Sequence, residues 1–335
     1  MSSPPRNGTR HVFAVAVLVP LIATLALCAF AWPSARTAPR DLPLGVAGPA
    51  AAAAQVEAGL TREKGAFEIH RYDDKAAARE AVEDRSVYGA IVVTADGTEL
   101  LTASAAGPAV AQALRTAVAD RAAAEGAEIR IVDVVPTPEA DPRGTTLSSS
   151  VLPLVLAGTA AGAMVALAGL RGGRAVTALV AASGLVGVGG TLIAHTWLEG
   201  LTGDRWAEAA VFALASLAVS SAVAGLAALM GQAGVAVVAT TMMLLGNPFS
   251  AAGSAPPMLP EPAGTIGQLL PPGAGVSLLR SVAFFDGAGA SGPLLTLGVW
   301  TVLGLSAMLV GGALRRRATA GHGEPARAPM PVAVG

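Results

Sequence analysis

The chain has 335 residues, of which 53% are hydrophobic and only 13% are charged, and its net charge is −1 at pH 7. Soluble domains carry about 25% charged residues, so this composition excludes an ordinary soluble enzyme and a disordered chain. The near-zero net charge argues against a nucleic-acid partner. The single cysteine, Cys28, excludes an internal disulfide and a multi-cysteine metal site.

The first apolar run covers residues 12–35 and contains no charged residue. It is long enough to cross roughly 30 Å of hydrocarbon as a helix. Arg6 and Arg10 precede it, so we expect residues 1–35 to form a cytoplasmic N-terminus and a first transmembrane helix. A signal peptide cleaved after Ala29-Phe30-Ala31 is the alternative, but the length of the run favours a retained anchor.

Residues 36–147 hold most of the charged residues and predict an inserted extracytoplasmic α/β domain between the first two spans. Alternating and apolar runs predict strands, and alanine-rich or Asp-capped runs predict helices. Asp96-Gly97 is typical of a hairpin turn. One histidine, His70, and no nucleophile motif favour a partner-binding or structural module over an enzyme. The expected order is β-α-β-α-β-β-α-β, with strands at 42–46, 67–72, 88–94, 99–103 and 128–135 and helices at 49–63, 74–85 and 108–124.

Further uncharged runs predict five more transmembrane helices in residues 148–314, which makes an α-helical polytopic membrane protein of six spans. Arginines cluster in segments 1–11, 171–174 and 315–335, whereas 36–147 has an excess of acidic residues. The positive-inside rule therefore predicts a multi-pass plasma membrane protein with both termini cytoplasmic, 315–335 being the cytoplasmic tail. The six expected spans are 12–33, 149–170, 175–197, 208–230, 233–251 and 293–314.

The segment before the last span is apolar, yet its many prolines forbid a continuous helix. We predict an outer re-entrant or interfacial pair of short helices at about 252–292; the alternative is a loop lying on the membrane surface. Arg280 and Asp286 are its charged candidates for closing or gating. The full set of candidate transport or gating residues is Asn247, Pro248, Gln268, Pro271, Pro272, Arg280, Phe284, Phe285 and Asp286.

Other motifs are less specific. No Walker A sequence occurs, so we expect no ATP hydrolysis by this chain alone, and no catalytic residue, cofactor or metal site is predicted. The pattern Gly158-Thr-Ala-Ala-Gly162 predicts close helix packing, with a dimer face as the alternative. His195 is expected near the membrane interface beside Trp197 and Glu199, with no buried Asp, Glu or Lys in the middle of a span to partner it.

Four strings carry a resemblance to a known family: LPLGV (42–46), SVYGAIVV (86–93), GNPFS (246–250) and LPPGAG with LLRSVAFFDG (270–287). Together with the predicted topology, they resemble the membrane subunits of type-2 ABC exporters, most closely the phage infection protein-like membrane proteins. The resemblance covers most of the chain. It implies outward movement of a hydrophobic or amphipathic substrate, contact with membrane lipid, a separate ATP-binding subunit and a homodimer or heterodimer.

The chain departs from that family at the cytoplasmic side. Its N-terminal segment is short, and the predicted inner loop is only Arg171-Gly172-Gly173-Arg174. Little surface is left for an ATPase to bind. The alternative function is therefore a non-enzymatic envelope receptor or scaffold, whose extracytoplasmic domain binds a partner.

Overall fold

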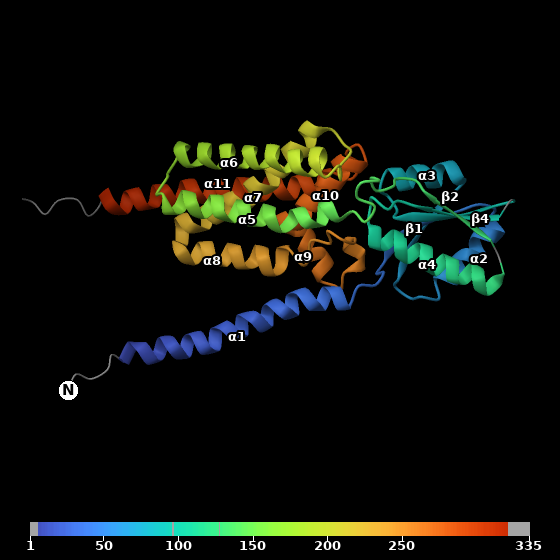
Figure 1. Ribbon diagram of the computed structural model, residues 1–335, viewed down its shortest axis with the longest axis horizontal. Coiled ribbons are helices and arrows are strands. Elements are labelled where there is room, and N and C mark those ends of the chain that lie inside the picture. The colour runs from blue at the N-terminus through green and yellow to red at the C-terminus, as the bar shows by residue number, and fades with distance from the viewer. Residues whose placement is uncertain (1–5, 96, 127, 321–335) are drawn as a thin grey trace, which may run out of the picture.

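The computed structural model describes residues 6–95, 97–126 and 128–320 (Figure 1). The chain is mostly helical and contains one small mixed sheet. Within those residues, five helices are long and apolar enough to cross a membrane. They cover Val12–Ala35, Thr145–Leu167, Gly173–Trp197, Arg205–Met230 and Ser291–Leu314.

A helical bundle is built around one central helix, α7 (Arg205–Met230). In its most apolar 18-residue window 67% of the residues are buried, against 22–28% for the three long helices around it. Small side chains dominate α7, which lets neighbouring backbones approach closely. Those neighbours are α5 (Thr145–Leu167), α6 (Gly173–Thr191), which continues as a π-helix (η1, Leu192–Trp197), and α11 (Ser291–Ala320).

Glycines set the closest approaches to α7. A Cβ added at Gly158 would lie 2.8 Å from Val219 Cβ, and one at Gly162 would lie 2.7 Å from Val223 Cβ. The Gly158–Gly162 pattern therefore packs α5 against α7 within one chain, as the sequence predicts. On the other side of α7, Gly304 of α11 lies against the backbone of Ser221.

The predicted span 233–251 is shorter than expected. It consists of the ten residues of α8 (Gln232–Thr241) and the five of a π-helix, η2 (Met242–Gly246). At 1.5 Å per residue such a helix is about 22 Å long, less than the roughly 30 Å of a hydrocarbon core. The regular helix ends at Gly246, and Pro248 follows two residues later with no backbone N–H to continue the helical hydrogen bonds.

The first helix, α1 (Arg6–Ala35), diverges from the bundle (Figure 1). None of its most apolar window is buried. It meets the rest of the helices near η2, where the Trp32 and Phe249 rings lie edge to face at 6.2 Å. An apolar helix with this exposure needs lipid or another protein surface around it.

The sheet unit (residues 42–133) contains the strands and helices predicted for this region, in the predicted order. Its sheet order is β2-β1-β3-β4-β5, antiparallel only between β3 and β4. Helix α3 covers one face, and α2 and α4 cover the other (Figure 1). The expected hairpin residue Asp96 lies outside the described residues. The elements are β1 (Leu42–Ala47), α2 (Ala50–Leu60), β2 (Phe67–Tyr72), α3 (Lys75–Glu83), β3 (Gly89–Thr94), β4 (Gly97–Thr102), α4 (Pro108–Glu125) and β5 (Ile129–Asp133).

The predicted boundary implies that residues 36–147 alone form the core of the sheet unit. In the structure, residues from further along the chain also contribute to that core. Phe285 packs into the core on the α3 face. Ala255 and Met258 pack into the core on the opposite face. The Ala38 amide also donates to the Met258 carbonyl at 3.0 Å. Sequence patterns miss these contributions because they come from a segment more than a hundred positions further along the chain.

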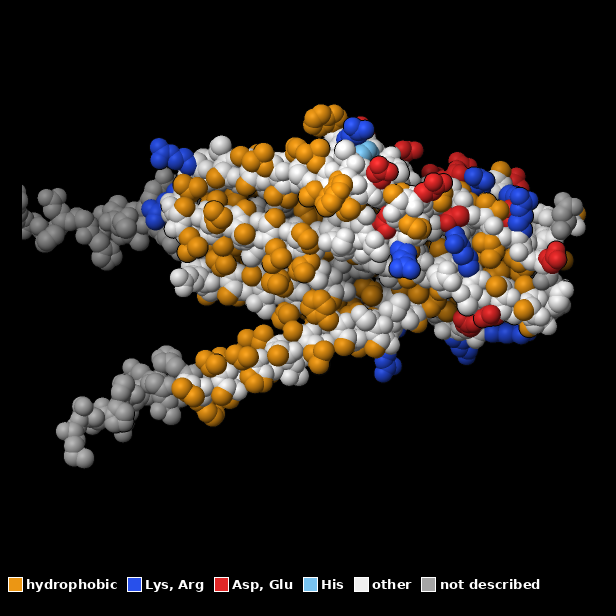
Figure 2. All heavy atoms as spheres, in the orientation of Figure 1, with side chains coloured by type: hydrophobic (Ala, Val, Ile, Leu, Met, Phe, Trp, Pro, Cys, Tyr) orange, Lys and Arg blue, Asp and Glu red, His pale blue; other side chains and the backbone are white. Residues whose placement is uncertain are grey.

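Charged and hydrophobic side chains are distributed differently over the bundle and the sheet unit. Hydrophobic side chains spread over the visible face of the bundle and α1, whereas acidic side chains gather on the sheet unit and the adjoining end of the bundle, and Lys or Arg side chains lie both there and at the far end of the bundle (Figure 2). The first turn of α1 and the last turn of α11 both lie at the end far from the sheet unit (Figure 1). Of the predicted cytoplasmic segments, residues 1–5 and 321–335 lie outside the described residues.

The contact at Gly304 gives a stability prediction. Replacing Gly304 with alanine should lower the free energy of unfolding by about 1–3 kcal/mol, because the added Cβ overlaps the Ser221 backbone. The matched control is Gly298→Ala in the same helix, where no atom lies within 4 Å of an added Cβ. Thermal unfolding in detergent should show a lower midpoint for Gly304→Ala only; equal midpoints would contradict this packing.

Candidate functional site

A broken helix lies between the bundle and the sheet unit. Helix α9 (Ala263–Leu269) ends at Leu270, whose extended backbone precedes two prolines. Helix α10 (Pro271–Phe284) begins with those prolines, which lack the N–H groups that a helix start leaves unpaired. Nearly all of α10 is buried, among α5, α7 and α11. The predicted pair of short helices is therefore present.

Side chains from three elements satisfy polar groups at the break. The Trp300 indole of α11 donates to the Leu269 carbonyl at 2.8 Å. The Ser277 hydroxyl donates to Gln268 Oε1 at 2.6 Å, and Gln268 Nε2 lies 3.5 Å from the Ser250 carbonyl. Irregular backbone is tolerated inside a helical bundle when protein groups complete its hydrogen bonds in this way. Both the oxygen and the nitrogen of the side-chain amide of Gln268, a predicted site residue, therefore have hydrogen-bond partners.

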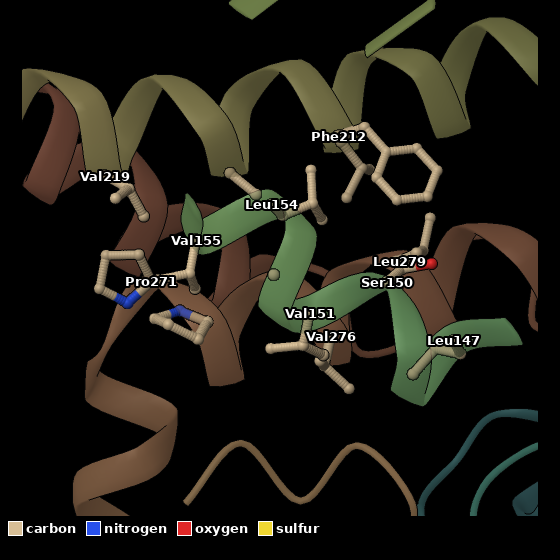
Figure 3. A pocket seen from close by; sticks show the side chains of 14 residues that line it. Leu147, Ser150, Val151, Leu154, Val155, Phe212, Val219, Pro271, Val276 and Leu279 are labelled. Carbon is tan, nitrogen blue, oxygen red and sulfur yellow. The ribbon is translucent and has the colours of Figure 1, made fainter. Parts of the chain in front are cut away.

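The N-terminal end of α10 is closely packed. A small apolar cavity of about 20 Å³ lies between α5, α7 and α10, with Val155, Val219 and Pro271 around it (Figure 3). That volume holds about one water molecule. The predicted residues Pro271 and Pro272 therefore line this small space between neighbouring helices.

The predicted residues Asn247 and Pro248 lie at the end of η2 and are half-buried. Just before them, a Cβ added at Gly246 would lie 2.7 Å from Pro272 Cγ. The end of the short α8–η2 segment thus lies beside the start of α10. The structure brings these four predicted residues into one region of the bundle.

A larger cavity of about 620 Å³ lies between α7, α8 and α11. Its walls are apolar, with Leu226, Val238, Met242, Trp300 and Leu303 among them. Its volume is in the range of about 300–1,000 Å³ that is usual for ligand sites. The sequence analysis did not identify it, because apolar residues that line a cavity have the same pattern as apolar residues in a packed bundle.

A third cavity, of about 230 Å³, lies where the sheet unit meets α10. In contrast to the other two, it has several polar residues in its wall. Gln268 and Ser277 contribute from the broken helix, and Arg85 and Tyr88 contribute from the sheet unit. We call it the junction cavity. Sequence analysis identified only Gln268 among its residues.

Arg85 joins the sheet unit to α10. Its guanidinium NH1 donates to the Ser281 hydroxyl and lies 3.3 Å from the Ser277 carbonyl and 3.4 Å from the Ala288 carbonyl. Its Cζ also lies 5.3 Å from the centre of the Phe285 ring, a cation–π contact. Burial lowers the pKa of Arg85, and nearby Tyr88 partly opposes that shift.

Arg280, a predicted site residue, is 2% exposed. Its Nη2 donates to the Ala252 carbonyl at 2.9 Å, and its Nε has no hydrogen-bond partner within the described part of the chain. Asp286 is exposed, and no ion pair joins it to Arg280 among the described residues. The two predicted gating charges are therefore not brought together.

The predicted aromatic residues Phe284 and Phe285 connect two hydrophobic cores. Phe285 is 5% exposed and belongs to the α3-side core of the sheet unit. Phe284 packs against that core and also against the core of the bundle. Their position indicates a structural link between the two parts of the molecule.

His195 has a buried carboxylate partner at the end of the neighbouring helix. Its Nδ1 lies 2.8 Å from Glu208 Oε2, and Glu208 is completely buried. Glu208 also accepts from the Gly203 amide at 3.0 Å, and Arg205 Nε lies 3.2 Å from His195 Nε2. The Glu208 carboxylate lies in the first turn of α7 and not in the middle of a span, because the loop after η1 folds the end of α6 onto the start of α7.

No protein-family model, curated protein or solved structure matches the chain. In the described ranges, no three His, Cys, Asp or Glu side chains are grouped so that they could hold a metal ion. The junction cavity and the broken helix therefore have to be interpreted from their own geometry.

The link at Phe285 gives a second stability prediction. Phe285→Ala should lower the free energy of unfolding by about 3–5 kcal/mol, because it leaves a void in a core shared by two parts of the chain. Leu269→Ala, at a side chain that is 62% exposed, is the control and should change stability little. Limited proteolysis of the sheet unit, read beside thermal unfolding, measures the effect. Similar protease sensitivity in both variants would refute the proposed link.

Proposed function

We propose that the chain is a permease-like membrane protein that exports a hydrophobic or amphipathic molecule and works with a separate ATP-binding subunit. The observation that best supports this function is the buried half-helix α10, which starts inside the bundle and ends against the sheet unit. Discontinuous helices of this kind form substrate sites in many transporters.

The surroundings of the helix break favour an amphipathic substrate. Trp300 lines the apolar cavity and donates to the carbonyl of Leu269. The neighbouring residue, Gln268, lines the polar junction cavity. An apolar space and a polar space thus lie on either side of the break between α9 and α10. A molecule with an apolar and a polar part would match this arrangement.

The proposed topology places the sheet unit outside the plasma membrane and both termini in the cytoplasm. The six spans would be α1, α5, α6 with η1, α7, the short α8–η2 segment and α11. Lipid would surround the exposed side of α1, and a second copy or a related chain would complete a homodimer or heterodimer. The distribution of charged and apolar side chains supports this orientation (Figure 2).

A second candidate function is a non-enzymatic envelope receptor or scaffold whose sheet unit binds a partner. One observation favours it: α5 and α6 are joined by only the short stretch between Leu167 and Gly173. A loop of this length gives an ATP-binding subunit little to contact. The two candidates differ in whether an ATPase accompanies the chain.

The topology can be tested with single cysteines in a Cys28→Ser background. We expect Lys64→Cys, on an exposed turn of the sheet unit, to react with an impermeant thiol reagent in intact cells. Gly173→Cys, where an added Cβ meets no atom within 4 Å, should react only after the membrane is permeabilised. Labelling of Gly173→Cys in intact cells would disprove this orientation.

The partner can be tested by purifying the intact chain in mild detergent after chemical crosslinking. We expect a stoichiometric ATP-hydrolysing subunit to accompany the parent chain and the Arg79→Glu control, whose side chain pairs with Glu83 on the sheet unit. The double variant Arg171→Glu/Arg174→Glu should lose that subunit while keeping its expression level. A crosslinked preparation without any ATPase would overturn the exporter proposal and favour the receptor or scaffold.

A further inference from the structure

We propose that the junction cavity binds a phosphate-type oxyanion between the guanidinium groups of Arg85 and Arg280. Arg85 lines the cavity. Arg280 is on the same helix as Ser277, another residue of its wall, at a spacing of three that places both on one helix face. The cavity thus has one cation in its wall, Arg85 from the sheet unit, and a second, Arg280, about one helical turn from Ser277 on α10 and outside the wall itself.

The positive charges of Arg85 and Arg280 are not balanced by a nearby carboxylate of any residue that the structure describes. Arg280 is 2% exposed and Arg85 is half-buried, yet neither has a carboxylate within 4 Å among the described residues. Their hydrogen bonds go to neutral carbonyl and hydroxyl oxygens. Buried charges are normally paired, because an isolated charge in a protein interior is costly. A bound anion would supply the missing negative charge.

Hydrogen-bond donors from both the sheet unit and α10 are available for an oxyanion. Arg280 Nε has no hydrogen-bond partner in residues 6–95, 97–126 and 128–320. Tyr88 lines the cavity and lies close enough to both guanidinium groups that they oppose the rise in pKa that burial gives its hydroxyl. A phenolic hydroxyl and two guanidinium groups all donate hydrogen bonds to phosphate oxygens. A tetrahedral phosphate has more acceptor oxygens than a carboxylate, so it suits donors that approach from two elements.

The junction cavity is also large enough for a phosphate group. The cavity volume of about 230 Å³ is several times the roughly 30 Å³ that one water occupies in the liquid. It accommodates a phosphate and part of a group esterified to it. Two sources could provide that chemistry: the headgroup of an anionic lipid-like molecule, or free phosphate. That the oxyanion belongs to the exported amphipathic molecule rests on the proposed function, whereas binding itself does not.

The test measures binding to the purified full-length chain in a neutral detergent at constant ionic strength. The probes are short-chain phosphatidylglycerol, short-chain phosphatidylcholine and inorganic phosphate, and the readouts are titration calorimetry and the thermal unfolding midpoint, which rises when a ligand binds only the folded state. We expect phosphatidylglycerol or phosphate to bind the parent chain. Arg85→Gln should raise the dissociation constant about tenfold or more, because it removes charged hydrogen bonds. Arg79→Gln, on the exposed face of α3, is the control and should bind as the parent does.

Arg280→Gln gives a second, opposite readout. Without any anion its unfolding midpoint should equal or exceed that of the parent, because a buried unpaired charge is removed. With the anion it should gain less stability than the parent. If Arg280→Gln does not fold, Tyr88→Phe takes its place in the titration and should bind several-fold more weakly.

Each outcome has a defined meaning. Binding of phosphatidylglycerol but not of phosphate supports the site and identifies a lipid-like source. Binding of phosphate alone supports the site and identifies a soluble source, which removes this site's support for an amphipathic substrate. No binding of either probe, or binding that is unchanged in Arg85→Gln, overturns the inference. Because no ATPase is needed, this result is independent of the test of the exporter proposal.

Discussion

The arrangement of the molecule depends on the end of α10, where one short segment is buried in two cores at once. Phe285 fills the α3-side core of the sheet unit, and Phe284 contacts both that core and the bundle. Arg85 lies over the Phe285 ring and binds the last turns of α10. The sheet unit is therefore fixed to the bundle through the same helix that contains the break. Movement of α10 and movement of the sheet unit are coupled by this contact.

Much of the fold could be predicted from local patterns. The alternation in Phe67–Tyr72 and the apolar run in Gly89–Thr94 each identify a strand without information from elsewhere. Proline pairs likewise identify the break before α10, since proline acts on its immediate neighbours. The length of α8–η2 was less predictable, because an apolar composition continues beyond Gly246 although the helix does not.

The sites depend on long-range contacts, and these were mostly missed. Gln268 and Arg280 were identified because polar residues are conspicuous in an apolar segment. Arg85 was not, because it ends an ordinary charged helix and its partner Ser281 is 196 positions away. Glu208 follows a short charged stretch at a helix start and has no local sign of burial, yet the loop before it folds over and buries it against His195. In each case the residue type can be read from the sequence, but its burial depends on segments that are not adjacent to it in sequence.

The shared core also has a consequence for how the chain is made. The strands of the sheet unit leave the ribosome long before Met258 and Phe285, which complete its two cores. During synthesis both faces of the sheet therefore stay incompletely covered until α5, α6 and α7 have been made and Met258 and Phe285 follow. The two cores of the sheet unit can therefore be completed only after the helices before Met258 have been made. Only α11 remains to be added to the bundle after the two cores of the sheet unit are complete.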